Sequence, residues 1–505
     1  FSKLSKSIPY ETAIIFENKK ISFSQLDQMS NSLAHFLREY GIKSNDIVPI
    51  ICERTYFYII AAFAIMKAGG AFVFIDPEFP NDRINYMIEE VNPKIILKYH
   101  SDKNIHLKLK YISSVYQYDL QSHNYDEHTE YIENINKADD TCYIFFTSGT
   151  TGKPKGVLIS HDNLAHYCIH SQTQNGVNCI YDKEYKKVLA FTQFTYAMIV
   201  IEIYYNLLKG KTLVLCNNKE YNDPELLGQL INKYEIEFLV STPSRINNYL
   251  SNIHFKESIK KVKIFNFSGE PITNNFIKSL RLLTNEDIYV GLGLTEATAY
   301  CALSKVTADD IKNEIITIGH PTCNYKFYIL DNDLKPVPIG VKGEIYIGGY
   351  SISKGYLNRE ELTSQRFIDN HIDPSSKTKL YKTGDIGRWT KDGRIVYIGR
   401  SDFQVKIRGQ RVELPEIENT IMKYPEIDYV IVIYKNNNIN NYLLCYYKTN
   451  SNKELNENDL KEFVSKQLPS YMCPNYYMRL NEIPLSPSGK LNRKALPEID
   501  ISKIS

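Results

Sequence analysis

The hydrophobic and polar positions along the chain alternate between helical and strand periods, which predicts a layered α/β fold. Residues 23–41 (FSQLDQMSNSLAHFLREYG) place apolar side chains at helical spacing and end at a glycine, as helices often do. Short apolar runs that are typical of buried strands lie between such segments. They are DIVPIIC (46–52), AFVFIDP (71–77), KIILKYH (94–100), TLVLC (212–216) and IEFLVSTPS (236–244).

The pattern changes in the second half of the chain. From about residue 315 the strands become shorter and turns more frequent, and KFYILDNDLKPVPIGVKGEIYIGG (326–349) predicts a β-rich layer. After VYIGRSD (396–402), two apolar runs (429–434 and 442–447) flank the turn-rich KNNNINN, which predicts a hairpin. We therefore predict a large domain over 1–401, made of layered α/β subdomains plus the β-rich layer, and a small mobile α+β domain over 402–505.

Length and charge limit the function classes. A chain of 505 residues is too long for a single core. Lys and Arg number 60 against 58 Asp and Glu, so no global field is available to hold nucleic acid or an anionic membrane. The most apolar stretch, 57–75, is interrupted by Lys67 and two glycines, so it predicts a buried helix, a turn and a strand and not a membrane span. Small molecules and proteins are the expected partners.

Cysteine usage and the N-terminal residues predict the compartment. The nine cysteines are scattered singly, without C-x-x-C pairs or metal-ligand spacing, which favours reduced thiols in the cytoplasm over a disulfide framework. The opening FSKLSKSIPYE has neither the apolar core of a signal peptide nor an initiator Met. We expect the chain to be part of a longer protein.

One loop has the composition of a phosphate-binding site. TSGTTGKPKG (147–156) holds three glycines, four hydroxyl side chains and two lysines in ten residues. Glycines let backbone N–H groups approach an anion, and hydroxyls and lysines add donors and charge. The spacing is not that of a P-loop nucleotide-binding motif. Composition alone fits a solvent-exposed turn between two strands as well as it fits a phosphate-binding loop.

A series of motifs resembles the adenylate-forming superfamily, which includes acyl-CoA synthetases, luciferases and nonribosomal peptide synthetase adenylation domains. The resemblance covers nearly the whole chain. In order, the motifs are KAGGAFVFIDPEFP (67–80), FTSGTTGKPKG (146–156), FSGEP (267–271), GLGLTEAT (291–298), GEIYIGG (343–349), YKTGDIGRW (381–389), GRSDFQVKIRGQRVELPEIE (399–418) and LSPSGKLNRKAL (485–496). The first and last of these look more like peptide-synthetase adenylation domains than free CoA ligases.

The resemblance implies a two-step reaction with ATP and Mg²⁺. A carboxylate attacks the α-phosphorus of ATP, and a phosphopantetheine thiol then takes the acyl group from the adenylate. The residues implied in gripping the β- and γ-phosphates are Thr147, Ser148, Gly149, Thr150, Thr151 and Lys155. Those implied in holding the nucleoside are Gly269, Glu270, Pro271, Gly291, Leu292, Gly293, Asp385, Tyr397 and Arg400. Leu292 stands where the family usually has an aromatic residue, so apolar packing replaces stacking on adenine.

The resemblance also assigns catalytic and conformational roles. Thr295 should contact the α-phosphate, and Glu296 should ligate Mg²⁺. Lys490 in PSGKLN should lie between the attacking carboxylate and the α-phosphate, although a solvated turn lysine is the plain alternative. Asp402 resembles the hinge of the small domain, or is a turn residue. Gly409 would leave room for pantetheine in a thiol tunnel.

The acid pocket departs from that of α-amino-acid enzymes. In FTQFTYAMIVIEIYYNLLKGKTL (191–213), Ala197 stands where those enzymes carry the Asp that pairs with the substrate ammonium. An unpaired buried ammonium is costly. A register error is the alternative, but no Asp occurs anywhere in the segment. The remaining pocket positions implied by the resemblance are Met198, Ile201, Val240, Asn266, Ser268, Gly291, Ala299 and Tyr300.

The sequence thus predicts a ligase for a carboxylic acid that is not a standard α-amino acid, such as an aryl, keto, hydroxy or β-functional acid. The expected acceptor is a peptidyl or acyl carrier protein. No carrier sequence follows within the chain, so an acid–CoA ligase stays open, as does an amino-acid or D-alanine–carrier ligase. A non-catalytic scaffold on the same fold is disfavoured by the intact motifs.

Overall fold

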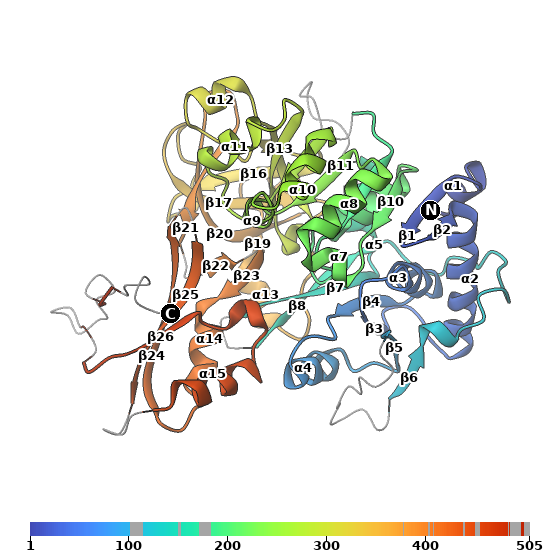
Figure 1. Ribbon diagram of the computed structural model, residues 1–505, viewed down its shortest axis with the longest axis horizontal. Coiled ribbons are helices and arrows are strands. Elements are labelled where there is room, and N and C mark those ends of the chain that lie inside the picture. The colour runs from blue at the N-terminus through green and yellow to red at the C-terminus, as the bar shows by residue number, and fades with distance from the viewer. Residues whose placement is uncertain are drawn as a thin grey trace.

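The computed structural model describes most of the chain. The described residues are 1–101, 115–149, 153–170, 183–376, 378–401, 404–407, 409–437, 440–449, 455–482, 484 and 496–498. In Figure 1 the N-terminal part lies on the right, the middle of the chain at the top, and the C-terminal part at the lower left.

One layer is built on a sheet that has seven strands among the described residues, in the order β18-β8-β7-β4-β3-β5-β6. The strands are β3 (Ile47–Cys52), β4 (Ala71–Ile75), β5 (Ile95–Tyr99), β6 (Tyr116–Asp119), β7 (Thr141–Thr147), β8 (Lys155–Ser160) and β18 (Gly355–Tyr356). The α-helices that belong to this part are α2 (Phe23–Glu39), α3 (Phe57–Ala68), α4 (Asn81–Val91) and α5 (His161–His170), and η2 (Leu120–Ser122) is a 3₁₀ turn. Strands β3, β4, β5, β6 and β7 pair in parallel.

Two helices of this layer show how the sequence determines local structure. Helix α2 starts with a capping box, in which the Ser22 hydroxyl accepts from Gln25 N and the Gln25 side chain accepts from Ser22 N. Helix α3 is apolar all round and packs against α2, β3 and β4, so it is buried. It ends at Gly69, whose φ of 107° lies in the left-handed region, and the chain turns directly into β4. The predicted helix, turn and strand over 57–75 is confirmed.

The second layer is a sheet of nine strands within the described ranges, in the order β15-β14-β13-β12-β11-β9-β10-β1-β2. The strands are β1 (Thr12–Phe16), β2 (Lys19–Ser22), β9 (Lys187–Ala190), β10 (Thr212–Leu215), β11 (Phe238–Ser241), β12 (Ile264–Phe267), β13 (Asp287–Gly293), β14 (Tyr300–Lys305) and β15 (His320–Pro321). The helices are α1 (Ser2–Ser7), α6 (Asn206–Leu208), α7 (Asn218–Asn222), α8 (Pro224–Tyr234), α9 (Pro243–Tyr249), α10 (Ile253–Ser258), α11 (Asn274–Arg281), α12 (Ala308–Lys312), the 3₁₀ turns η5 (Ile259–Lys261) and η6 (Thr295–Ala297), and the π-helix η4 (Val200–Tyr205).

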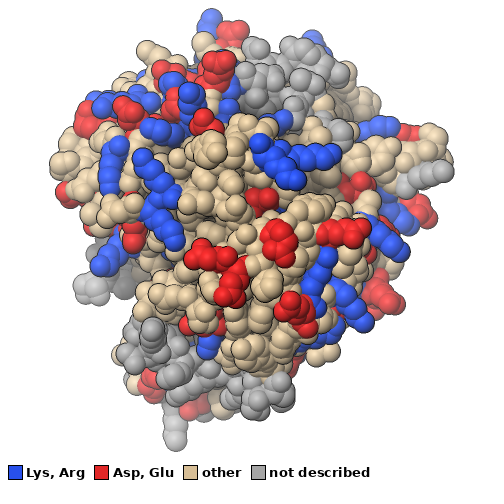
Figure 2. All heavy atoms as spheres, turned by 90° about the vertical axis from the view of Figure 1, so that its right-hand side faces the viewer, with Lys and Arg blue, Asp and Glu red and all other residues tan. Residues whose placement is uncertain are grey.

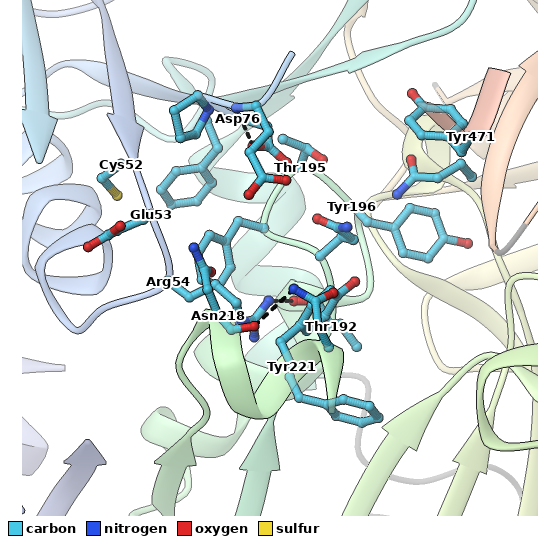
Figure 3. A pocket seen from close by; sticks show the side chains of 18 of the residues that line it. Cys52, Glu53, Arg54, Asp76, Thr192, Thr195, Tyr196, Asn218, Tyr221 and Tyr471 are labelled. Atoms are coloured by element: carbon cyan, nitrogen blue, oxygen red, sulfur yellow. Dashed lines mark hydrogen bonds between the residues drawn. The ribbon is translucent and has the colours of Figure 1, made fainter. Parts of the chain in front are cut away.

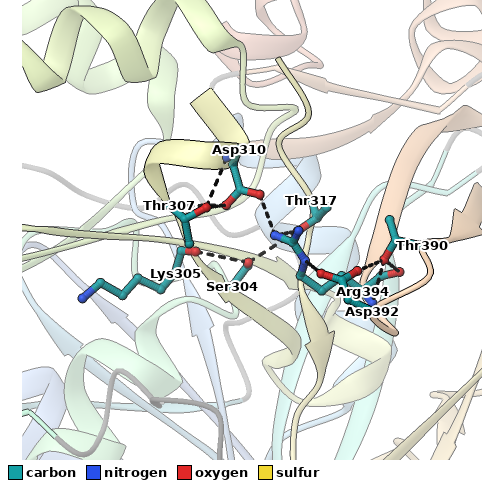
Figure 4. Close-up of polar contacts among 8 residues, drawn as sticks. All are labelled: Ser304, Lys305, Thr307, Asp310, Thr317, Thr390, Asp392 and Arg394. Atoms are coloured by element: carbon teal, nitrogen blue, oxygen red, sulfur yellow. Dashed lines mark hydrogen bonds and ion pairs between the residues drawn. The ribbon is translucent and has the colours of Figure 1, made fainter. Parts of the chain in front are cut away.

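The predicted β-rich layer is a sheet of five strands among the described residues. It contains β16 (Tyr325–Leu330), β17 (Gly343–Gly349), β19 (Phe367–Asp369), β20 (Lys379–Trp389) and β21 (Ile395–Arg400), with α13 (Glu360–Arg366) and η7 (Pro374–Ser376). Arg394 joins this layer to α12. Its guanidinium donates to Asp310 at 2.6 Å and to Asp392 at 2.7 Å, with Thr317 and Thr390 around it (Figure 4).

The C-terminal part has its own apolar cluster. Strands β22 (Gln404–Ile407) and β23 (Gln410–Glu413) form a hairpin, and β24 (Ile427–Asn437), β25 (Asn440–Thr449) and β26 (Tyr476–Arg479) form a sheet. Helices α14 (Leu414–Ile421) and α15 (Glu457–Ser465) and the turn η8 (Ser470–Met472) complete it. The predicted hairpin around KNNNINN is present as β24 and β25, with Val432 opposite Cys445.

Surface and cysteines agree with the composition. Figure 2 shows acidic and basic side chains interspersed over one face of the molecule. In the described part of the chain, no helix combines the length and apolarity that a membrane span requires. The cysteines that the structure describes are free thiols, and most of them are buried.

Candidate active site

The phosphate-type loop connects two paired strands. Thr147 ends β7 and Lys155 begins β8, and the two residues lie opposite each other in the antiparallel register. The Thr147 hydroxyl is buried and has no hydrogen-bond partner among the described residues, so it is available to a ligand. Thr150 and Thr151 lie outside the described residues.

Lys155 points its ammonium group into the interior. It is 5% exposed, and its Nζ lies 4.6 Å from the centre of the Tyr356 ring. Burial, together with the nearby charge of Arg411, lowers the pKa of Lys155 to about 8, and Glu296 opposes this shift. A buried cation at the end of the loop is what an anionic ligand requires.

Glu296 is the most deeply placed charge of the site. It lies in the 3₁₀ turn η6 and is fully buried. Both carboxylate oxygens accept from Arg411 Nη1 at 2.9 Å, and the Tyr356 hydroxyl donates to Oε1 at 2.8 Å. Burial alone would raise the pKa of Glu296, but Arg411 and Lys155 outweigh it and bring the pKa to about 2. Glu296 is therefore a carboxylate at neutral pH.

A strained residue holds this turn in place. Thr298 has φ of 65° and ψ of −55°, which is unusual for a β-branched residue. Its hydroxyl donates to Ser351 O at 2.7 Å, and Ser353 N donates to Glu296 O at 2.9 Å. Such strain persists where neighbouring contacts fix the backbone, and here those contacts position Glu296.

The structure limits how Mg²⁺ could be held. Among the described residues, no group of three or more His, Cys, Asp or Glu side chains could ligate a metal. Glu296 fits as a single hard oxygen ligand, because Mg²⁺ commonly takes one or two carboxylates together with substrate phosphates. Arg411 occupies both oxygens of Glu296 in this arrangement, so Mg²⁺ fits only where Arg411 is withdrawn.

Asp385, the predicted ribose ligand, is buried at the centre of β20. Its Oδ1 accepts from Arg400 Nη1 at 2.8 Å, while its Oδ2 is buried without a hydrogen-bond partner among the described residues. Tyr397 and Arg400 lie on β21, the neighbouring strand. A buried acceptor with one open oxygen suits a ligand hydroxyl group.

Gly269 and Gly409 approach each other closely. A Cβ on Gly269 would lie 3.4 Å from Gly409 Cα, and a Cβ on Gly409 would lie 2.4 Å from Thr242 Cγ2. Both glycines have φ in the left-handed region, at 88° and 80°. Glu270 Oε1 accepts from Gly409 N at 2.8 Å. The β22–β23 hairpin therefore packs directly on the segment Gly269, Glu270 and Pro271, and Asp402 before it lies outside the described residues.

The predicted acid pocket is largely assembled. Six of the predicted positions line one pocket beside Thr295 and Gly293; they are Ala197, Met198, Ile201, Ser268, Ala299 and Tyr300. The chain that carries Ala197 and Met198 continues directly into the π-helix η4. π-Helical turns are frequent at functional sites. The other three positions lie outside the lining, on the strands behind it; they are Val240 on β11, Asn266 on β12 and Gly291 on β13. Leu292 is buried in the main apolar core.

The charges around this pocket are positive. Its described lining contains no carboxylate side chain, whereas Lys406 and Arg411 reach it from the C-terminal part. Asn266 is fully buried, and its amide has no hydrogen-bond partner among the described residues. Burial raises the pKa of the Tyr300 hydroxyl, and nearby Ser268 opposes this shift. The pocket thus offers apolar surface and neutral hydrogen-bonding groups.

A larger cavity of about 260 Å³ adjoins the acid pocket and shares Tyr196 and Met198 with it. Figure 3 shows Cys52 and Glu53 at one side and Tyr471 at the other. Arg54 fixes the wall by donating to Thr192 O at 2.8 Å, with its guanidinium 4.4 Å from the Phe194 ring centre and 4.5 Å from that of Tyr221.

This cavity contains a carboxyl group, on Asp76, that is largely shielded from solvent. Burial raises the pKa of Asp76 to about 6. Its Oδ1 accepts from Glu78 N at 2.9 Å, which opposes the shift.

Sequence reasoning missed the residues that connect distant segments. The sequence assigns no role to Tyr356 or Arg83. Tyr196, Lys406, Arg411 and Glu416 lie within the motifs quoted above but receive no role of their own. Arg83 and Glu416 are 333 positions apart, so spacing carries no signal for their contact. Lys490 lies outside the described residues, so its role stays a prediction.

Comparison with known proteins identifies the family. A family described as AMP-binding enzyme matches residues 3–357, and an AMP-binding enzyme C-terminal domain matches residues 416–490. Bacitracin synthase 2 of Bacillus licheniformis is 34% identical over 504 residues, which is 99% of this chain and 19% of that protein. Tyrocidine synthase 1 of Brevibacillus parabrevis is 32% identical over 506 residues, 99% of this chain and 45% of that protein. The chain thus spans less than half of either relative.

A solved structure shows the same fold. The NpsA–ThdA protein, an artificially fused adenylation–PCP di-domain NRPS from Klebsiella oxytoca, superposes with a TM-score of 0.81 at 24% identity, covering 95% of this chain and 93% of that one. The predicted α/β fold with a large N-terminal and a small C-terminal part is confirmed. The chain belongs to the AMP-binding enzyme family of adenylate-forming ligases, and along nearly its whole length it is similar to a segment of bacitracin synthase 2.

Proposed function

We propose that this domain activates a carboxylic acid without an α-ammonium group and passes it to the phosphopantetheine thiol of a carrier protein. In the first step, a carboxylate oxygen of the acid bonds to the α-phosphorus of ATP, and the bond to the bridging oxygen of pyrophosphate breaks. In the second, the thiol sulfur bonds to the acyl carbon of the adenylate, the thiol proton is lost, and AMP leaves. The acyl group ends as a thioester.

The residues of the site suit these steps. Thr147 and Lys155 would hold the β- and γ-phosphates, because a hydroxyl donor without a described partner and a buried cation both favour an anion. Asp385 Oδ2 would accept from the ribose. Mg²⁺, bound through Glu296 and the phosphates, would neutralise part of the charge at the α-phosphorus. The buried walls exclude water, which would otherwise hydrolyse the mixed anhydride.

The observation that carries the proposed acid class is the charge around the pocket. Ala197 stands where the resemblance implies a carboxylate that pairs with an α-ammonium, and the described lining offers no other carboxylate side chain. Burying an ammonium without a counter-ion is unfavourable by several kcal/mol, on the order of the penalty for an unpaired buried ion. An aryl, keto, hydroxy or β-functional acid avoids this cost.

A matched pair of variants tests this reading of the pocket. Ala197→Asp restores a carboxylate, so we expect ATP–pyrophosphate exchange with one or more apolar α-amino acids to rise at least about tenfold. Ala197→Asn has nearly the same volume but no charge and should not show the rise. If both variants gain equally, the added polar group and not the charge is responsible, and the proposed role of position 197 is wrong.

The proposed acceptor is a carrier-bound thiol. The cavity between Glu53 and Tyr196 shares Tyr196 and Met198 with the acid pocket, and we propose that the pantetheine arm approaches the adenylate from this side. Thioester formation is measured with the same acid on a holo-carrier protein and on coenzyme A at equal thiol concentration. We expect the carrier to be loaded faster; faster reaction with coenzyme A would favour an acid–CoA ligase instead.

A further inference from the structure

Two fully buried asparagines differ in their hydrogen bonds. Asn206 and Asn266 both have 0% of their surface exposed. The Asn206 oxygen accepts from the Tyr185 hydroxyl at 2.7 Å. Its amide nitrogen donates to Ile201 O at 2.8 Å and to Glu202 O at 3.2 Å. Among the described residues, neither atom of the Asn266 amide has a hydrogen-bond partner. An unpaired donor and acceptor in the interior destabilise a fold, which favours a bound molecule that completes them.

Asn266 lies on the face of its sheet that carries the acid pocket. Successive side chains of β12 point to opposite faces: Phe265 and Phe267 pack in one apolar cluster, and Ile264 packs in the main core. Asn266 therefore shares the face of Ile264. Ser268, which follows the strand directly, is on that face as well and lines the pocket. The unpaired amide thus lies just beyond Ser268, at the inner end of the pocket.

The strands beside Asn266 surround it with apolar contacts. Val240 of β11 and Tyr289 of β13 are its partners in the register, and both belong to the main apolar core. Two residues beyond Tyr289, Gly291 has no side chain, and a Cβ there would lie 3.3 Å from Tyr300 Cδ2. The Tyr300 ring therefore covers this position, and Tyr300 itself lines the pocket.

The polar groups of the pocket are of two kinds. Lys406 and Arg411 bring positive charge from the C-terminal part, and they line the pocket together with Thr295, the predicted α-phosphate contact. The groups on the strand side, Ser268 and Asn266, are neutral. An acid whose carboxylate lies at the charged side turns its other end toward these neutral groups.

We propose that the acid carries a neutral hydroxyl or carbonyl oxygen at the end remote from its carboxylate, and that the Asn266 amide binds this oxygen. The inference rests on the proposed function, in which this pocket holds the acid. An amide both donates and accepts, so it pairs with a hydroxyl or with a carbonyl group. Because Asn266 lies beyond the open part of the pocket, the oxygen must reach past Ser268. A hydrocarbon acid of the same shape would leave the amide unpaired.

Matched acids test the proposal with the unmodified chain. ATP–pyrophosphate exchange is measured with pairs of acids that share a skeleton, one with a distal hydroxyl or oxo group and one without it. In the best pair we expect kcat/KM of the oxygenated acid to be at least about 100-fold higher, since a site built to hydrogen-bond a substrate group rejects an analogue that lacks it. Equal values in the best pair, or a hydrocarbon acid as the best substrate, would overturn the proposal.

Replacing the amide tests the residue. Asn266→Leu keeps a branched side chain but removes both hydrogen-bonding atoms, so the preference for the oxygenated acid should fall at least about tenfold. Asp310→Asn, in the remote Arg394 cluster, is the control and should keep the preference of the parent chain. A folded Asn266→Leu protein with an unchanged preference would show that another group binds the oxygen.

Thermal unfolding of the protein without substrate gives an independent readout. Asn206→Leu breaks three hydrogen bonds, whereas the same substitution at Asn266 breaks none. The midpoint of Asn266→Leu should therefore lie at least about 3 °C above that of Asn206→Leu. If the two variants lose the same stability, the Asn266 amide is already paired in the free protein, and the proposal is wrong.

The proposed function and this inference fail in different ways. Dominant exchange with a standard α-amino acid contradicts the proposed function. Dominant exchange with an acid that has neither an α-ammonium group nor a distal oxygen contradicts this inference alone.

Discussion

Two arginine–carboxylate clusters look alike and serve different ends. Arg394 pairs with Asp310 and Asp392 at 2.6 and 2.7 Å and joins α12 to the turn between β20 and β21 (Figure 4). Arg411 pairs with Glu296 at 2.9 Å and joins the C-terminal hairpin to the phosphate side of the site. The Arg394 cluster is surrounded by Thr317 and Thr390, and it contains none of the site residues. The second uses groups that the substrate also needs, so its contacts are exchangeable.

The largest expected effect comes from breaking the exchangeable cluster. Arg411→Gln should slow thiol transfer from a preformed acyl-adenylate about 100-fold, since removing one partner of a buried pair costs about 3 kcal/mol and disfavours this arrangement. ATP–pyrophosphate exchange should stay within about threefold, because Arg411 is not paired with Glu296 when the metal is bound.

Rapid-quench measurement of the two half-reactions in one preparation checks this prediction. An equal loss of rate in both half-reactions would mean that Arg411 stabilises the fold as a whole, as Arg394 does. The proposed difference between the two clusters would then be wrong.

The second effect falls on stability. Asp310→Asn removes the charge that faces Arg394 and weakens the cap at Thr307, so the free energy of unfolding should fall by about 2 to 3 kcal/mol. Urea denaturation measures the loss. Both half-reactions per folded molecule should be unchanged; a selective loss of thiol transfer would show that this cluster, too, takes part in the conformational change.

The smallest effect concerns Asp392 and pH. A hydrogen bond from Thr390 and the charge of Arg394 hold the pKa of Asp392 below its usual value. A lowered carboxyl pKa contributes stability above the unfolded-state value of about 3.9, and this stability is lost as the pH falls through the folded-state pKa. The side chain is 56% exposed, so solvent screening limits the contribution to less than about 1 kcal/mol.

Thermal midpoints of the parent chain and Asp392→Asn should therefore differ slightly at pH 6 and converge once the pH has fallen through the folded-state pKa of Asp392. A difference that grows toward low pH would have the wrong sign for a lowered pKa.

Much of the fold could be predicted from local patterns. Apolar periodicity predicted α2, α3 and the buried strands, and the turn-rich KNNNINN predicted the β24–β25 hairpin. The apolar runs around the glycine-rich loop suggest two strands, but the pairing of Thr147 with Lys155 is seen only in the structure. The π-helix over 200–205 could not be predicted, because a single-turn distortion leaves no period in the sequence.

The site was predictable only in part. Motif resemblance named six residues that line one pocket, but it also named Val240, Asn266 and Gly291, which the structure places behind that lining. The contacts of Arg411 with Glu296 and of Glu416 with Arg83 depend on how the C-terminal part packs on the rest. No local pattern encodes such long-range pairs, so they required the structure.

The central claim is that the chain adenylates an acid without an α-ammonium group. ATP–pyrophosphate exchange across the twenty standard amino acids and a panel of aryl, keto, hydroxy and β-amino acids tests it most directly, with Lys490→Ala as the blank. The account predicts that one acid of the second group dominates. Dominant exchange with a standard α-amino acid would contradict it and would require another group to hold the ammonium beside Ala197.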